Sequence, residues 1–74
     1  MAYIAAMKQQ SIQRPKKHNP TEATYDVVIV NGEKFLQIAT YGSSTREIPG
    51  KASQVIQFDT QSLAQLKRII EDYF

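Results

Sequence analysis

The last third of the chain joins a short apolar segment to a helix that begins at a capping residue. Residues 53–58 are rich in Val, Ile and Phe, which favour a strand. Asp59 is a good N-cap, and Phe58 and Leu63 have the spacing of a hydrophobic staple around it. The pattern therefore predicts a strand over residues 53–58 and a helix from Asp59 to the C-terminus.

The predicted helix has an apolar stripe at helical spacing. The stripe consists of Leu63, Leu66, Ile69, Ile70 and Tyr73. Its simplest interpretation is that it faces the core. No Gly or Pro stops the helix before Phe74, so its last turn is a candidate subunit contact.

A hairpin is predicted upstream. Residues 25–30 are mostly β-branched, Asn31-Gly32 follows, and residues 34–41 form a second apolar run. Asn-Gly tolerates the positive φ angles of a type I′ turn, whose twist matches two antiparallel strands. In the second strand, one face carries Leu36, Ile38 and Thr40, and the other carries Phe35, Gln37, Ala39 and Tyr41. We expect the aliphatic face to meet the helix.

Together these elements predict an α+β fold, an antiparallel sheet of three or four strands followed by one C-terminal helix. Residues 24–74 would form this domain, and a fourth strand would have to come from Tyr3 to Met7. A long connection over residues 42–52, with a turn at Pro49-Gly50, returns the chain for the strand before the helix.

Residues 1–23 have a different composition. They contain Pro15 and Pro20, many polar side chains, and four cations against one anion; these charges are Lys8, Arg14, Lys16, Lys17 and Glu22. We expect a basic, flexible N-terminal arm that contacts an anionic partner. The alternative is a solvated leader without a partner.

Length and composition limit how the domain is stabilised. A 74-residue domain buries only about 60% of its unfolded surface, and the absence of cysteine excludes disulfides. With a single histidine, a structural zinc site is nearly excluded, so we expect a homodimer. No apolar run is long enough to span a membrane and no secretory signal is evident, so we expect a cytoplasmic protein without membrane contact.

Catalysis finds little support in the sequence. His18 lies between prolines in the arm, and Asp26, Glu33 and Glu47 lack the spacing of metal ligands or of paired carboxylates. We therefore expect no enzyme activity, no catalytic residue, no metal and no cofactor.

Two surfaces are candidates for binding. The first is the loop of residues 42–46 with Lys51, whose hydroxyls, N–H groups and Arg46 suit phosphates; alternatively, these hydroxyls satisfy the loop backbone. The second is the open sheet face with Phe35 and Tyr41, where aromatic rings beside cations suit single-stranded nucleic acid. The alternative for these two rings is burial in a dimer interface.

The order of elements is similar to that of a known family. The relevant segments are Tyr25-Asp26-Val27-Val28-Ile29-Val30, Gly32-Glu33-Lys34-Phe35-Leu36-Gln37-Ile38, Tyr41, Pro49-Gly50-Lys51, Val55-Ile56-Gln57-Phe58 and residues 61–70. The chain resembles the single-stranded DNA-binding domain of the transcriptional coactivator positive cofactor four. The resemblance implies a curved antiparallel sheet with one helix, dimerisation through that helix, and a grip on single strands by aromatic and basic residues.

The chain departs from that family where the family carries an arginine and a tryptophan for DNA contacts. Ala39 and Gly42 correspond best to these positions, so the grip would come from Tyr41, Arg46 and Lys51 instead.

The sequence hypothesis is therefore single-stranded nucleic-acid binding, in transcription or replication control. The predicted platform residues are Lys34, Phe35, Tyr41, Arg46 and Lys51, and the predicted arm residues are Arg14, Lys16 and Lys17. The second hypothesis is a small phage-like or accessory regulator that binds a protein partner through its sheet edge or helix face.

Overall fold

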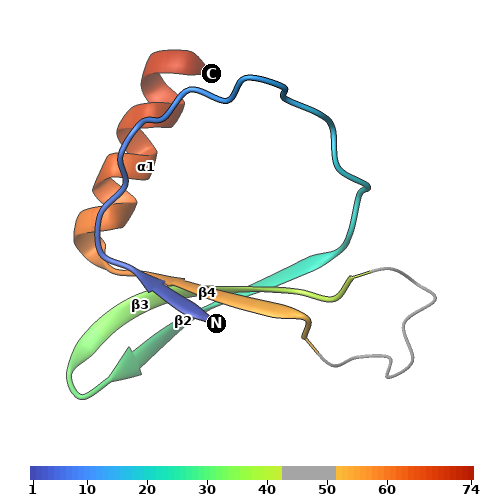
Figure 1. Ribbon diagram of the computed structural model, residues 1–74. Coiled ribbons are helices and arrows are strands. Elements are labelled where there is room, and N and C mark those ends of the chain that lie inside the picture. The colour runs from blue at the N-terminus through green and yellow to red at the C-terminus, as the bar shows by residue number, and fades with distance from the viewer. Residues whose placement is uncertain (43–51) are drawn as a thin grey trace.

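The computed structural model describes residues 1–42 and 52–74. Within these residues the chain forms four strands and one helix, shown in Figure 1: β1 (Ala2–Ile4), β2 (Ala23–Val30), β3 (Glu33–Thr40), β4 (Gln54–Phe58) and α1 (Thr60–Tyr73). The strand order in the sheet is β1-β4-β3-β2. The predicted α+β fold, with its sheet and C-terminal helix, is confirmed.

The hairpin forms at the predicted residues. Asn31 and Gly32 have φ angles of 51° and 81°, as a type I′ turn requires, and Val30 pairs with Glu33 across the turn. The strands β2 and β3 then stay in register over all eight residues of each strand. The turn thus fixes which side chains of the hairpin share a face.

The fourth strand comes from the N-terminus, inside the range predicted to be an arm. It covers Ala2–Ile4 and runs parallel to β4, whereas the other two strand pairs are antiparallel. Its register places Tyr3 beside Gln57 and Ile4 beside Phe58. Tyr3 and Ile4 thereby place their side chains on the sheet, which explains why an otherwise polar segment begins with a strand.

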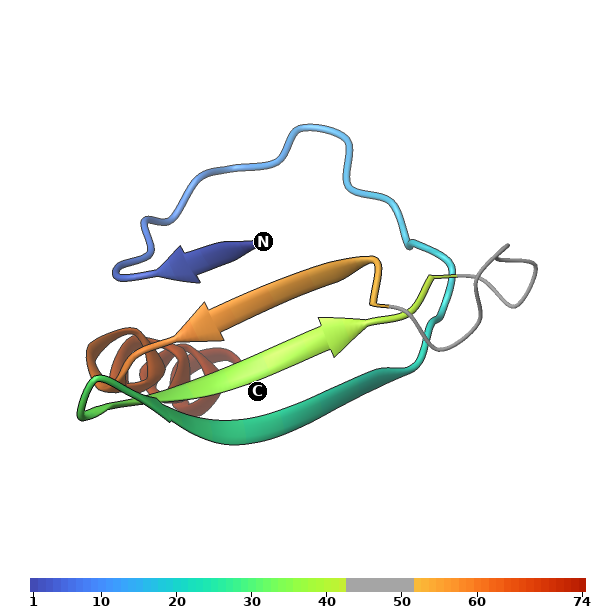
Figure 2. The same ribbon diagram turned by 90° about the horizontal axis from the view of Figure 1, so that it is seen from below.

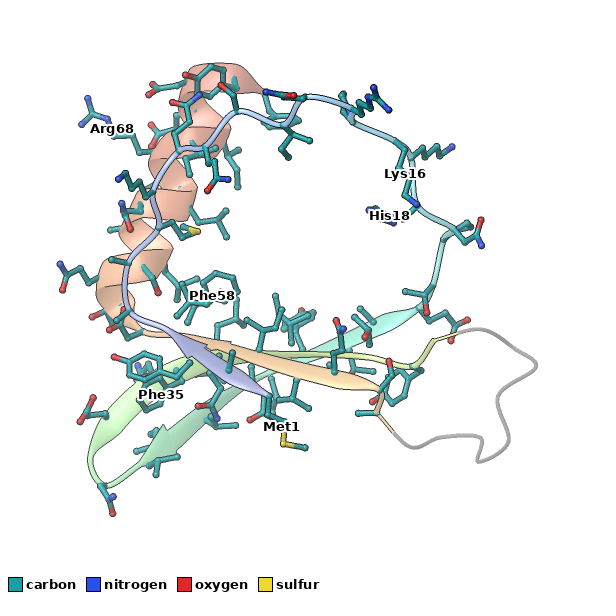
Figure 3. The ribbon with its side chains drawn as sticks, in the orientation of Figure 1. Met1, Lys16, His18, Phe35, Phe58 and Arg68 are labelled. Carbon is teal, nitrogen blue, oxygen red and sulfur yellow. The ribbon has the colours of Figure 1, made fainter. Side chains whose placement is uncertain are left out.

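The two faces of the sheet differ in their cover. Phe58 projects from β4 toward the side on which α1 lies, and Leu36 and Ile38 share this face with it (Figure 3). We call this the helix side. The other face carries Phe35, Gln37 and the residues that pair with them in register. Figure 2 looks onto this face, and the helix lies behind the sheet in that view. We call this the open face.

The helix begins as predicted but leaves the sheet. Asp59 is its N-cap, and its side chain accepts a hydrogen bond from the Ser62 N–H at 2.8 Å. Leu63 and Leu66 are half-buried, whereas Ile70 is 52% and Tyr73 70% exposed, because α1 extends away from the sheet (Figure 1). The expectation that the whole apolar stripe faces the core is therefore wrong for its C-terminal half. No helix in residues 1–42 or 52–74 is long and apolar enough to cross a membrane.

The core is small. Among the described hydrophobic side chains, only Phe35, Ala39 and Phe58 are buried, each with 9% exposure. Phe58 is the last residue of β4 and directly precedes the helix cap, so it packs at the junction of sheet and helix. We therefore expect this one ring to contribute strongly to the packing of the helix on the sheet.

We predict that Phe58→Ala lowers the free energy of unfolding by about 3 kcal/mol, because it removes a buried ring and leaves a cavity. Urea unfolding followed by circular dichroism measures this change. Ile12→Ala is the control, because Ile12 is 75% exposed in the arm, and it should leave the urea midpoint nearly unchanged. Equal effects of the two substitutions would contradict the central role of Phe58.

Candidate nucleic-acid interface

A row of polar side chains crosses the open face. Tyr3 of β1 pairs in register with Gln57 of β4, Gln57 pairs with Gln37 of β3, and Gln37 pairs with Asp26 of β2. Because register partners point to the same face, the four side chains lie side by side across the sheet. Figure 2 looks onto this face.

The two glutamines in the middle of the row bind each other. Gln57 Nε2 donates a hydrogen bond of 2.9 Å to Gln37 Oε1, and both side chains are half-buried. A shallow depression lies over the row, lined by Met1, Ala2, Tyr3, Gln37, Val55 and Gln57. An aromatic ring and a joined pair of amides therefore line the same depression.

Tyr3 is held on two sides. Its ring meets the Phe35 ring edge to face, with centroids 5.2 Å apart and planes at 83°. Its hydroxyl donates a hydrogen bond to Asp59 Oδ2. The side chain remains 50% exposed, so the ring has a fixed orientation and an accessible surface.

Asp59 serves two elements at once. One carboxylate oxygen accepts from the Ser62 N–H and caps the helix, and the other accepts from Tyr3. The Tyr3 hydroxyl, followed by the Ser62 N–H, lowers the pKa of Asp59 below its ordinary value because both donors favour the carboxylate. The same hydrogen bond raises the pKa of Tyr3, because it favours the protonated phenol.

The predicted platform residues are divided between the two faces. Phe35 lies on the open face, where Tyr3 packs against it and leaves it 9% exposed. Lys34 pairs with Ile29 near the turn and lies on the helix side, because adjacent residues of a strand alternate. Tyr41 follows β3, is half-buried, and its hydroxyl is 2.8 Å from Thr24 Oγ1. Arg46 and Lys51, with the turn at Pro49-Gly50, lie outside the described residues.

The basic residues of the arm are all exposed. Arg14, Lys16 and Lys17 lie on the stretch that passes over the helix side and, in Figure 2, beyond the β1 edge of the sheet. The start of the arm is tied to the helix, because Gln65 accepts from the Met7 N–H at 2.8 Å and donates to the Met7 carbonyl at 3.0 Å. His18 is exposed on the far stretch of the arm, near Lys16 (Figure 3).

Sequence reasoning expected a Gln or Ser side chain of residues 53–58 beside Gln37 on this surface, and Gln57 takes that place, but it did not assign Tyr3 to the surface. The register pairing of Tyr3 with Gln57 belongs to a parallel strand pair. More than fifty residues separate the two partners in the sequence, so no local pattern indicates the pairing. The alternation of residues 53–58 was the one local signal, since it places Gln57 on the face opposite Ile56 and Phe58.

No family model, curated protein or solved structure matches the chain.

We predict that the free energy of unfolding decreases as the pH is lowered and Asp59 becomes protonated. The folded pKa of Asp59 lies below its ordinary value of 3.8, so its contribution is complete above that pH and is lost as the pH falls through the lower, folded pKa. Thermal unfolding from pH 7 to pH 2 measures this loss. Asp59→Asn, which retains a capping side chain, should show a smaller decrease in melting temperature over the same range.

Tyr3→Phe is the matched variant, because it keeps the ring and removes only the hydroxyl bound to Asp59. It should also reduce the acid dependence. If Tyr3→Phe and the wild type lose the same number of degrees between pH 7 and pH 2, the hydrogen bond does not contribute to this titration.

Proposed function

We propose that the protein binds single-stranded nucleic acid in the cytoplasm, in transcription or replication control. The observation that supports this most is the open sheet face, where the half-exposed Tyr3 ring and two half-buried amides line one shallow depression. Aromatic rings on a sheet bind single strands because unpaired bases stack on them without regard to sequence. In a duplex the bases are stacked on one another, so they are not available to stack on a ring of this face.

The charge of the arm supports the same proposal. Within residues 1–42 and 52–74, no carboxylate forms an ion pair with Arg14, Lys16 or Lys17, and all three are exposed. These cations are available to phosphates of a strand that leaves the open face over the β1 edge. Arg46 and Lys51 of the loop would add to this charge, and Tyr41 would offer a second ring beyond Ala39 on the same face.

We also propose that the protein is a homodimer. A domain of 74 residues buries only about 60% of its unfolded surface and has no cysteine for disulfides, so burial against a second copy would add stability to its small core.

The distribution of apolar side chains supports a partner on the helix side. Tyr25, Val27 and Ile29 of β2 share that face and are more than half exposed, and Ile70 and Tyr73 are exposed on the helix. A second copy of the chain is present wherever the protein is made, so it can bury these apolar side chains permanently. A protein partner of another kind is the second candidate, and the same exposed residues favour it.

We predict that single-stranded DNA binds tightly at low salt and that the affinity falls steeply with salt. Replacing Arg14, Lys16 and Lys17 together by Ala should lower the slope of log K against log salt by about 2, at roughly 0.7 per lost phosphate contact. Fluorescence anisotropy of a labelled mixed-sequence strand, with duplex DNA as competitor, measures both effects.

Replacing Lys67 by Ala provides the control, because it removes an exposed cation on the helix rather than on the arm. It should change the slope by less than 1. Absence of binding at low salt would overturn the nucleic-acid proposal and favour a protein partner, whose apolar interface responds little to salt.

We predict that the wild-type protein sediments as a dimer of 8.4 kDa chains and that Ile70→Glu shifts it to the monomer, because a charge is costly to bury in an apolar interface. Sedimentation velocity over a range of concentrations measures the change. Ala64→Glu adds the same charge at an exposed helix position outside the apolar stripe and should leave the dimer intact. A monomeric wild type at all concentrations would contradict the proposal.

A further inference from the structure

The row across the open face contains the two kinds of group that recognise one base. An aromatic ring offers a stacking surface, and amide groups offer hydrogen bonds to a base edge. Tyr3, Gln57 and Gln37 bring these groups together on three adjacent strands, which are spaced about 4.8 Å apart. We infer that these three residues form a pocket for a single nucleobase, and this inference rests on the proposed function.

Tyr3 is prepared for stacking. Its ring is fixed at one edge by Phe35 and at the hydroxyl by Asp59, and half of its surface remains exposed. A base that stacks on a ring already held in place does not have to order that ring on binding. The sequence hypothesis gave the stacking role to Phe35 and Tyr41; in this pocket Phe35 instead supports the ring that stacks.

The glutamine pair has hydrogen-bonding groups to spare. Each amide carries two N–H donors and an oxygen with two lone pairs, and the bond between Gln57 and Gln37 uses one donor and one lone pair. The remaining donors of Gln37 and the oxygen of Gln57 provide donors and an acceptor in the same depression. Base edges also place donors and acceptors side by side, and a glutamine amide pairs with adenine in this way. The pocket therefore discriminates between bases.

Carboxylates limit where a phosphate can lie near the pocket. The row ends at Asp26, whose carboxylate accepts the Val27 N–H at the β2 edge, and the Asp59 carboxylate binds the Tyr3 hydroxyl. Both negative charges repel phosphates, so the sugar-phosphate backbone would lie away from both carboxylates, and the basic arm runs beyond the β1 edge (Figure 2).

The test compares the binding of labelled dA, dC and dT decamers to the wild type and to variants, at one salt concentration. Gln37→Leu and Gln57→Leu should each reduce the ratio between the strongest and weakest decamer by about tenfold, since the amides discriminate between bases. Gln54→Leu is the matched control, because Gln54 lies on the same strand but on the helix side, and it should leave the ratio unchanged.

Tyr3 has its own pair of variants. Tyr3→Leu should weaken binding of every decamer by about tenfold through the loss of stacking, whereas Tyr3→Phe, which keeps the ring but loses the hydrogen bond to Asp59, should weaken binding less than Tyr3→Leu. Circular dichroism shows whether Tyr3→Leu remains folded, and the glutamine variants test the pocket independently of it.

The outcomes separate the inference from the proposed function. A wild type that binds no decamer overturns both. A wild type that binds, with glutamine variants that keep its base order and its ratios, overturns the pocket alone and leaves single-strand binding in place. Loss of the ratio in Gln37→Leu and Gln57→Leu, with an unchanged salt slope, supports the pocket.

Discussion

The carboxylate of Asp59 joins the two ends of the chain. One oxygen caps the first turn of the helix, and the other binds the hydroxyl of Tyr3, fifty-six residues earlier in the sequence. This hydrogen bond holds β1 at the point where β4 becomes α1. Tyr3 in turn covers Phe35, one of the few buried hydrophobic side chains in the part of the chain that the structure describes. The orientation of the candidate stacking ring and the start of the helix therefore depend on the same side chain.

The local elements were predictable because their causes lie within a few residues. Asn31-Gly32 determines the hairpin turn, and Asp59 determines the start of the helix, so both were assigned correctly. The strand β1 was foreseen only as one possible source of a fourth strand. Its three residues carry no strong strand signal, and they are ordered by contacts with Phe35, Asp59 and Phe58 rather than by their own propensity.

The candidate site was predictable in part for the same reason. Alternation along β3 separates Phe35 and Gln37 from Leu36 and Ile38, so the open face was expected at the right residues. Which of these side chains remain accessible depends on β1, because Tyr3 covers Phe35 and adds its own ring to the surface. A sequence pattern specifies the face of a strand, but the exposure of each side chain depends on what a distant segment places over it.

The two faces of the sheet suit different partners, and their separation is what makes both proposals compatible. The helix side carries exposed apolar groups from β2 and α1, which a second copy would bury, while the open face carries Tyr3 and the two glutamines in a shallow depression. A dimer formed through the helix side leaves both open faces accessible. Two such faces on one dimer would bind one strand with a higher overall affinity than either face alone, because the second contact is intramolecular. The stability of the small domain and its affinity for a single strand would then depend on the same association.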